Sequence, residues 1–230
     1  MKLVTWNIRK CVGLDRRRDP HRVGSIIAGM SPDVVVLQEA DRRLGERPAA
    51  LPHDVVDAVT GLRPLQIAGN DVSLGWHGNA ILLAEGVEAS DVVTLDLPGL
   101  EPRGAVIADL SNSGIEVRIV AVHLGLLRRS RKRQLRVIQD KLSELPERPT
   151  VVMGDFNEWS FKRGLGALSN FDIHAPGQSF HSARPIAALD RIAITRDLEL
   201  TEAGVEDTAV TRRASDHLPV WGRIGISQAA

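Results

Sequence analysis

The sequence predicts an α/β fold, and two hydrophobic patterns support this prediction. Short apolar runs rich in β-branched residues, at 34–37 and 150–153, are too brief for helices and are typical of strands buried on both faces. Another segment instead carries apolar residues at helical spacing, namely Val23, Ile26, Ile27 and Met30. We therefore expect helices that lay an apolar face on a β-sheet.

The first half of the chain contains most of the expected strands. Residues 2–6 form the first strand, and Asp19 and Pro20 supply the N-cap and the first position of the following helix. A short helix is expected within residues 48–60. The next strands are expected at 78–83, 91–97, 104–110 and 115–122, with a hairpin turn at 111–114. This central block is predicted to be antiparallel.

The second half begins with a long helix, predicted at 128–145 from a spaced apolar face. The first turns of this helix are strongly basic, and cations at a helix N-terminus oppose the helix dipole. Either solvation of these side chains or a bound phosphate would account for the basic residues. The same two explanations hold for the basic loop at 9–18. The strand at 150–153 is expected to break at Gly154. A short helix near 161–168 and strands at 187–194 and 218–226 follow.

Composition limits the class of protein. The 230 residues fit a single domain spanning 1–230. Lys plus Arg equals Asp plus Glu at 29 each, so only a local patch, and no global basic field, could attract nucleic acid. Aromatic residues are 3% of the chain and Tyr is absent, which argues against the aromatic platforms that grip single-stranded nucleic acid.

The cysteine content and the N-terminus bear on the compartment. The one cysteine, Cys11, excludes an intrachain disulfide and a cysteine-based zinc cluster, as expected in a reducing compartment. The apolar run at the N-terminus is interrupted by charged residues after only a few positions, which is too short for a signal peptide or a membrane span. We therefore expect a cytoplasmic protein without a transmembrane segment.

Side chains with oxygen or imidazole groups recur at or near the ends of the expected strands. Asp155 and Asn157 follow the central strand, where open α/β sheets place ligands, although Gly, Asp and Asn are also common turn residues. A single histidine or glutamate in such a place is more often structural, but eight similar placements predict one polar pocket. The eight are Asn7, Glu39, His123, Asp155, Asn157, Asp190, Asp216 and His217.

Six short motifs carry these residues through nearly the whole chain. They are Thr-Trp-Asn at 5–7, Leu-Gln-Glu at 37–39, Val-His-Leu at 122–124, Gly-Asp-Phe-Asn at 154–157, Leu-Asp-Arg-Ile at 189–192 and Ser-Asp-His at 215–217. Each motif alone is weak. Together, in this order, they resemble the endonuclease/exonuclease/phosphatase superfamily, which includes pancreatic-type deoxyribonuclease, neutral sphingomyelinases and inositol polyphosphate 5-phosphatases. The compact chain is similar to bacterial members of that group.

The resemblance implies a four-layer α/β/β/α sandwich, in which two mixed sheets pack face to face with helices outside. It also implies metal-dependent hydrolysis of a phosphate ester. By this resemblance, the metal-site residues are Asn7, Glu39 and Asp216. The catalytic residues are Asp155 and Asn157 at the attacking water, His123 at the phosphate, and His217 paired with Asp190.

These residue types also suit phosphodiester hydrolysis for independent chemical reasons. The transition state gains negative charge, which Mg²⁺ or Mn²⁺ and a protonated histidine neutralise. Carboxylate and amide oxygens are hard ligands that suit these ions. A carboxylate beside a histidine orients the imidazole and raises its pKa.

The expected function is therefore that of a Mg²⁺-dependent phosphodiesterase, with further phosphate contacts at Arg103 and Asn79. The absence of Tyr argues against an abasic-site endonuclease. A nuclease acting on DNA or RNA is the alternative within the enzyme class, and a lipid phosphodiesterase would use the basic residues at 128–136 against anionic headgroups. A non-catalytic phosphate-binding module is the alternative of another class, and the intact set of eight polar residues argues against it.

Overall fold

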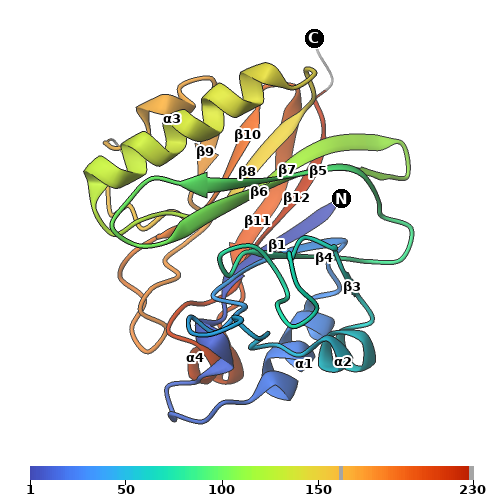
Figure 1. Cartoon of the computed structure of the whole chain (residues 1–230), viewed down its shortest axis with the longest axis vertical. Helices are drawn as coiled ribbons and strands as arrows, with labels where there is room; N and C mark the ends of the chain where they lie inside the picture. Colours follow the sequence, from blue (N-terminus) through green and yellow to red (C-terminus); the bar gives the residue numbers. More distant parts are fainter. Residues whose placement is uncertain (161–162, 228–230) are drawn as a thin grey trace.

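Two β-sheets face each other, with helices on their outer surfaces (Figure 1). The computed structural model describes residues 1–160 and 163–227, and within these ranges each sheet has six strands. Across the first sheet the order is β11 (Leu198–Val205), β12 (Val220–Ile226), β1 (Lys2–Asn7), β2 (Val34–Gln38), β4 (Ala80–Leu83) and β3 (Arg63–Pro64). Across the second it is β5 (Glu88–Leu97), β6 (Arg103–Asn112), β7 (Ile115–His123), β8 (Thr150–Asp155), β10 (Asp190–Thr195) and β9 (Phe171–His174). The expected four-layer α/β/β/α sandwich is confirmed.

Both sheets are mixed. β1 pairs in parallel with β2 and β7 pairs in parallel with β8, whereas the other pairings are antiparallel. The register sets Asn7 beside Gln38, and it sets Asp155 between His123 and Asp190. The polar residues at the strand ends therefore gather at one edge of each sheet.

Apolar side chains fill the space between the sheets and the space under the helices. Successive residues of a strand point to opposite faces, so Leu3 packs between the sheets while Val4 packs under the helices. In the second sheet Met153 likewise faces the first sheet and Val152 faces outward. Burial on both faces explains why these strands read as continuous apolar runs.

The helices lie on opposite outer surfaces (Figure 1). α1 (Pro20–Met30), α2 (His53–Val55) and α4 (Ala209–Ala214) lie on the side of the first sheet, and α3 (Arg128–Glu144) lies on the second. As expected, α1 begins at Pro20, where the side chain of Asp19 accepts a hydrogen bond from the backbone N–H of Arg22 at 2.9 Å. Leu135 and Ile138 of α3 are fully buried against the sheet. No helix in the described ranges is long and apolar enough to cross a membrane.

The expected strand break at Gly154 is wrong. β8 continues through Gly154 to Asp155, and Gly154 has a φ of 145°. A Cβ at this position would lie 1.9 Å from the carbonyl oxygen of Val122. Glycine is therefore required by the close approach of β7, not by a turn.

Other boundaries also differ from expectation. β5, β6 and β7 are antiparallel as expected, but the strand expected at 78–83 is β4, which pairs with β2 in the other sheet. The helix expected within 48–60 is the short α2 followed by a π-helical turn at Val56–Thr60. The helix expected near 161–168 begins outside the described residues, and Gly166–Leu168 form a 3-10 turn. β3, β9, β11 and α4 are additional elements.

A buried cluster of charges holds the start of α3 on the second sheet. Glu158 is fully buried, and its two carboxylate oxygens accept hydrogen bonds from Arg128 and Arg131, each at 2.7 Å. Arg131 also donates to the backbone carbonyls of Gly125 and Leu126. Burial raises the pKa of Glu158, but the two guanidinium groups outweigh burial and lower this pKa from 4.5 to about 2.

We expect Glu158→Gln to destabilise the protein by about 2–4 kcal/mol at neutral pH, because two guanidinium groups lose their buried counter-charge. The carboxyl group has its lower pKa in the folded state. Its contribution is therefore complete above pH 4.5 and is lost as the pH falls toward 2. Denaturant unfolding of both proteins, from neutral pH downward, should show their difference in unfolding free energy shrinking through this window.

The matched control is Glu144→Gln, which removes an exposed ion pair with Lys141 on the same helix. Exposed pairs contribute little, so this variant should unfold like the wild type. A difference between Glu158→Gln and wild type that stays constant as the pH falls would contradict the assigned ion pairs.

Candidate functional site

Polar side chains from both sheets meet at the edge where β1, β7 and β8 end. Asn7 ends β1, His123 ends β7, Asp155 ends β8, Asp190 begins β10, and His217 lies just before β12. All five side chains belong to buried residues. Asn7 and His217 come from the first sheet and the others from the second, so the cluster bridges the two sheets.

Asp155 lies at the centre of this cluster. Its Oδ2 accepts a hydrogen bond from Nδ2 of Asn7 at 3.1 Å, and it lies 3.4 Å from Nε2 of His123 and 3.7 Å from Nε2 of His217. Its Oδ1 accepts a hydrogen bond from the backbone N–H of Asn157 at 2.9 Å. Burial raises the pKa of Asp155 above its usual value, although the charge of His217 opposes this shift. The carboxylate is therefore a stronger base than an exposed aspartate.

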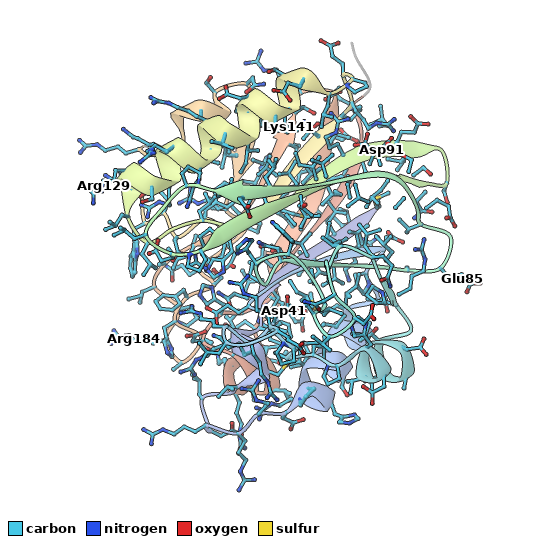
Figure 2. The ribbon with its side chains drawn as sticks, in the orientation of Figure 1. Asp41, Glu85, Asp91, Arg129, Lys141 and Arg184 are labelled. Carbon is cyan, nitrogen blue, oxygen red and sulfur yellow. The ribbon has the colours of Figure 1, made fainter. Side chains whose placement is uncertain are left out.

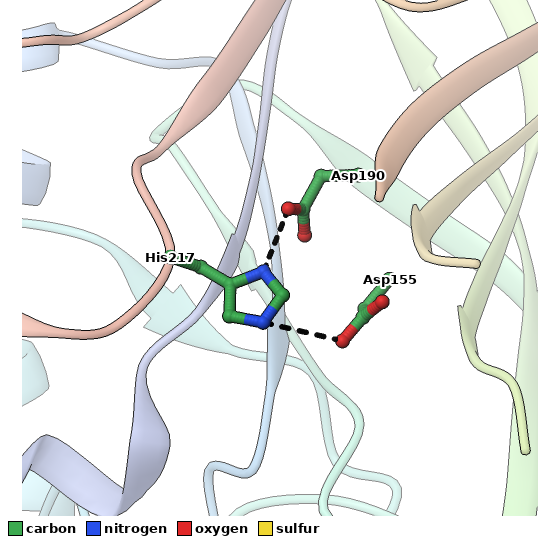
Figure 3. Close-up of side chains that lie close together, drawn as sticks. All are labelled: Asp155, Asp190 and His217. Carbon is green, nitrogen blue, oxygen red and sulfur yellow. Dashed lines mark hydrogen bonds and ion pairs between the residues drawn. The ribbon is translucent and has the colours of Figure 1, made fainter. Parts of the chain in front are cut away.

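His217 lies between two carboxylates (Figure 3). Its Nδ1 is 2.8 Å from Oδ2 of Asp190, and its Nε2 faces Asp155. The hydroxyl of Ser179 donates to the same Oδ2 of Asp190 at 2.5 Å. Burial lowers the pKa of His217, but Asp190 and Asp155 outweigh burial and raise it to about 10. The ring is therefore held in one orientation as an imidazolium.

His123 has the opposite electrostatics. Nη1 of Arg103 lies 2.8 Å from Nδ1 of His123. Because a guanidinium can only donate, Nδ1 of His123 is the acceptor and its proton lies on Nε2, which faces Asp155. Burial and the charge of Arg103 lower the pKa of His123 well below its usual value. The site therefore combines one neutral and one protonated histidine.

Glu39 and Asp216 flank this centre, and each carboxylate contacts basic side chains. Glu39 follows β2 with a φ of 54°, a left-handed conformation that costs a side chain of this size roughly 1 kcal/mol. Lys10 contacts its Oε2, and Nη2 of Arg43 lies 3.5 Å from its Oε1. Burial raises the pKa of Glu39, but these cations give a net lowering. Oδ2 of Asp216 lies 3.5 Å from Nε of Arg9, so the start of the basic loop faces carboxylates.

Two groups of residues offer ligands for a divalent cation. One ligand atom from each of the buried residues Asp155, Asp190 and His217 lies within 4.8 Å of the other two, which makes this group a candidate divalent-metal site. Oδ1 of Asp190 is also buried without a hydrogen-bond partner among the described residues. The residues expected to hold the metal, Asn7, Glu39 and Asp216, offer hard oxygen ligands. Asn7 contacts Asp155, whereas Glu39 contacts Lys10 and Arg43, and Asp216 contacts Arg9.

The side-chain amides of two predicted site residues, Asn79 and Asn157, donate hydrogen bonds to backbone carbonyls. Nδ2 of Asn79 donates to the backbone carbonyls of Trp76 and Gly104, and Asn79 is fully buried. Both amide protons of Asn79 are therefore engaged. Nδ2 of Asn157 donates to the carbonyl of Leu124 at 2.9 Å, which fixes this half-buried side chain beside Asp155.

The basic start of α3 is divided between two roles. Arg128 and Arg131 pair with the buried Glu158, whereas Arg129 projects from the surface (Figure 2). Lys132, Arg133 and Arg136 are exposed as well. The exposed cations of this cluster are therefore solvated, whereas Arg128 and Arg131 are neutralised by Glu158.

The match to a family model decides the relationship that the motifs suggested. A model described as "Endonuclease/Exonuclease/phosphatase family" matches residues 4–217. The chain belongs to this family. Its members are generally hydrolases of phosphoric esters, and the buried aspartate and histidine cluster lies within the matched region.

Individual similar proteins show how far the similarity extends. The uncharacterized protein YbhP of Escherichia coli K12 is 29% identical over 161 residues, which cover 65% of this chain and 63% of YbhP. A protein of unknown function from Enterococcus faecalis V583 superimposes with a TM-score of 0.79 at 20% identity, covering 99% of this chain and 100% of the other. A mannosyl-6-phosphatase of Bacteroides thetaiotaomicron VPI-5482 gives a TM-score of 0.79 at 16% identity, with coverage of 98% and 100%. At these identities the two structures are evidence of a shared fold alone.

Several residues that contact the site are not among those expected from the sequence. Ser179 bonds Asp190, Lys10 and Arg43 contact Glu39, and Glu158 anchors the first turns of α3. Ser179 has one sequence signal, because it opens the Ser-Phe-His-Ser segment before the Leu-Asp-Arg-Ile motif. The contacts of Lys10 and Glu158 join separate segments of the chain, whereas Arg43 lies four residues after Glu39.

We expect Asp190→Asn to lower the pKa of His217 from about 10, because the carboxylate that bonds Nδ1 loses its charge. An NMR titration of the His217 ring in both proteins measures this change. Asp172→Asn, at an exposed position on β9, is the matched control and should leave the His217 pKa where it is in the wild type. The same pKa in Asp190→Asn and wild type would contradict the role given to Asp190.

Proposed function

We propose that the protein is a divalent-metal-dependent phosphodiesterase that cleaves a phosphate ester by in-line attack of an activated water. The observation that carries this proposal is the buried Asp155 between a protonated His217 and a neutral His123. Asp155 is thus a base held between a cationic donor, His217, and a neutral donor, His123. Negative charge would develop at this point during attack on phosphorus.

Asp155 is the general base of this proposal. Its raised pKa makes it better suited to take a proton from water, and the amide of Asn7 and the backbone of Asn157 hold it in place. Asn157 lies next to the same carboxylate, where it steadies the water and the phosphoryl oxygens. His217 donates its Nε2 proton toward the phosphoryl group, since Asp190 occupies its Nδ1.

The donor chemistry favours Asn7, Glu39 and Asp216 as ligands for Mg²⁺ or Mn²⁺. A metal on the group of Asp155, Asp190 and His217 would have to displace a proton from His217, whose pKa the two carboxylates raise to about 10. Asn7, Glu39 and Asp216 instead offer hard oxygens, and the net lowering of the Glu39 pKa keeps that carboxylate ionised. When bound, the cation supplies positive charge against the phosphoryl oxygens.

His123 and Arg103 complete the contacts to the phosphate. Arg103 orients His123 through Nδ1, so that the neutral ring presents its Nε2 proton to the site. A nuclease acting on DNA or RNA is the second candidate, supported by the exposed cations of α3 at Arg129, Lys132, Arg133 and Arg136. Plasmid nicking that weakens steeply with salt would favour the nuclease over a small-molecule diesterase.

We expect Asp155→Asn to reduce kcat for bis(4-nitrophenyl) phosphate by about 10²- to 10³-fold, because the base is lost while the fold is kept. EDTA should abolish wild-type turnover, and Mg²⁺ or Mn²⁺ should restore it. Release of 4-nitrophenolate gives the rate, and circular dichroism verifies folding. Asp172→Asn, an exposed aspartate on β9, is the matched control and should retain full activity.

Equal turnover by Asp155→Asn and wild type would overturn the assignment of the base. Turnover that persists in EDTA would overturn the role of the metal. Phosphate-ester binding without turnover under any metal would identify a non-catalytic binding module on the same scaffold.

A further inference from the structure

A cationic cavity opens beside the site, next to Glu39 and His123. Its volume is about 90 Å³, and one wall comes from the segment between β2 and α2. Five cationic side chains line it, together with His77 and His123, against three carboxylates. The cations are Lys10, Arg42, Arg43, Arg47 and Arg103.

Two of the three carboxylates, those of Glu39 and Asp41, are already engaged, whereas Oε2 of Glu101 is buried without a hydrogen-bond partner among the described residues. Glu39 contacts Lys10 and Arg43. Asp41 is buried and points into the protein, where it accepts hydrogen bonds from the backbone N–H groups of Leu74 and Gly75. Glu101 has one oxygen that accepts from the backbone N–H of Leu126 at 3.4 Å. None of these carboxylates forms an ion pair with Arg42, Arg47 or Arg103.

Arg103 gives the clearest sign that the cavity receives an anion. It is 8% exposed, and within residues 1–160 and 163–227 no carboxylate lies in ion-pair range of its guanidinium. Its Nε is buried without a hydrogen-bond partner among the same residues. The more distant charges of Asp155, Glu39 and Glu101 offset the burial of this cation only in part, so burial lowers its pKa. An anionic ligand would offset the remaining cost of burial.

The wall formed by the segment between β2 and α2 is held in shape by backbone contacts. Arg42 donates its backbone N–H to the carbonyl of Pro48, and Asp41 bridges to Ala49, so this segment doubles back on itself. The hydroxyl of Ser73 donates to the carbonyl of Arg47. The guanidinium of Arg47 donates to Nδ1 of His77 at 3.0 Å, and Nε2 of His77 bonds Asp96 at 2.8 Å. The side chain of Arg47 is thus oriented before any ligand binds.

One phosphodiester does not account for this many positive charges. It carries a single negative charge, which Arg103, His217 and the proposed cation already face. Arg42 and Arg47 line the same cavity and come from the segment between β2 and α2. We propose that this wall, through Arg47 and Arg42, binds a second phosphate group of the substrate. The inference rests on the proposed function for its reaction, and it assigns the substrate class as esters that carry two phosphates.

The test compares bisphosphonates with monophosphonates, whose carbon–phosphorus bonds the enzyme does not hydrolyse. Alkane-α,ω-bisphosphonates with spacers of two, three and four carbons are titrated by calorimetry against the matching alkylphosphonates, with and without saturating Mg²⁺. For at least one spacer we expect the second phosphonate to tighten binding to wild type about tenfold, the value of one charge-assisted contact. Arg47→Gln should lose most of this gain, and Arg47→Lys should keep part of it.

Arg196→Gln is the matched control, because Arg196 is exposed and lies just past the end of β10 that is far from Asp190. It should keep the full gain. If Arg47→Gln fails to fold by thermal unfolding, Arg42→Gln takes its place. A wild type that binds no bisphosphonate more tightly than its monophosphonate, or a gain that survives in the folded variant, overturns the inference.

The two proposals fail separately. If the enzyme turns over a diester through Asp155 but binds no bisphosphonate more tightly than the matching monophosphonate, only the second-phosphate pocket is overturned. A bisphosphonate gain that Arg47→Gln removes, without turnover of any diester, overturns the phosphodiesterase alone and leaves the pocket in place.

Discussion

The hydrogen bonds that cross between the two sheets are the constraint on which the site depends. Asp155 and Asp190 are buried on the second sheet, and a buried carboxylate without partners is costly. Their partners Asn7 and His217 come from the first sheet, at 3.1 and 2.8 Å. The cluster therefore exists only when the sheets pack face to face, and the apolar layer between them sets its distances. Stability and site geometry are coupled through that layer.

The two histidines show how neighbours decide the chemistry of one residue type. Both are buried, and burial lowers the pKa of each. His217 has carboxylates on both ring nitrogens, which reverse the effect of burial, whereas His123 has the guanidinium of Arg103 on one side, which adds to it. Only the protonated ring can neutralise charge on a phosphoryl group. The division of roles follows from the placement of Asp190 and Arg103.

Much of the fold and the identity of the polar cluster could be predicted, because buried strands have continuous apolar runs and the polar residues begin where those runs end. β11 could not be read in this way, since it is an edge strand that mixes apolar and polar residues and has one buried residue, Leu198. The ion pairs of Glu39 with Lys10 and of Glu158 with Arg131 join segments that are separated in the sequence. Sequence spacing carries no record of such contacts.

The two sets of arginines, at the start of α3 and after Glu39, differ in the carboxylates available to them. The start of α3 and the segment after Glu39 each contain several arginines. In the structure, Glu158 is inserted under α3 and takes up two of the helix arginines, so that cluster is in part an anchor for the helix. In the segment after Glu39, the backbone of Leu74 and Gly75 occupies both oxygens of Asp41, and Glu39 pairs with Arg43. Arg42 and Arg47 therefore line the cavity without an ion pair to a described carboxylate, and this difference separates a structural cluster from one that can select a ligand.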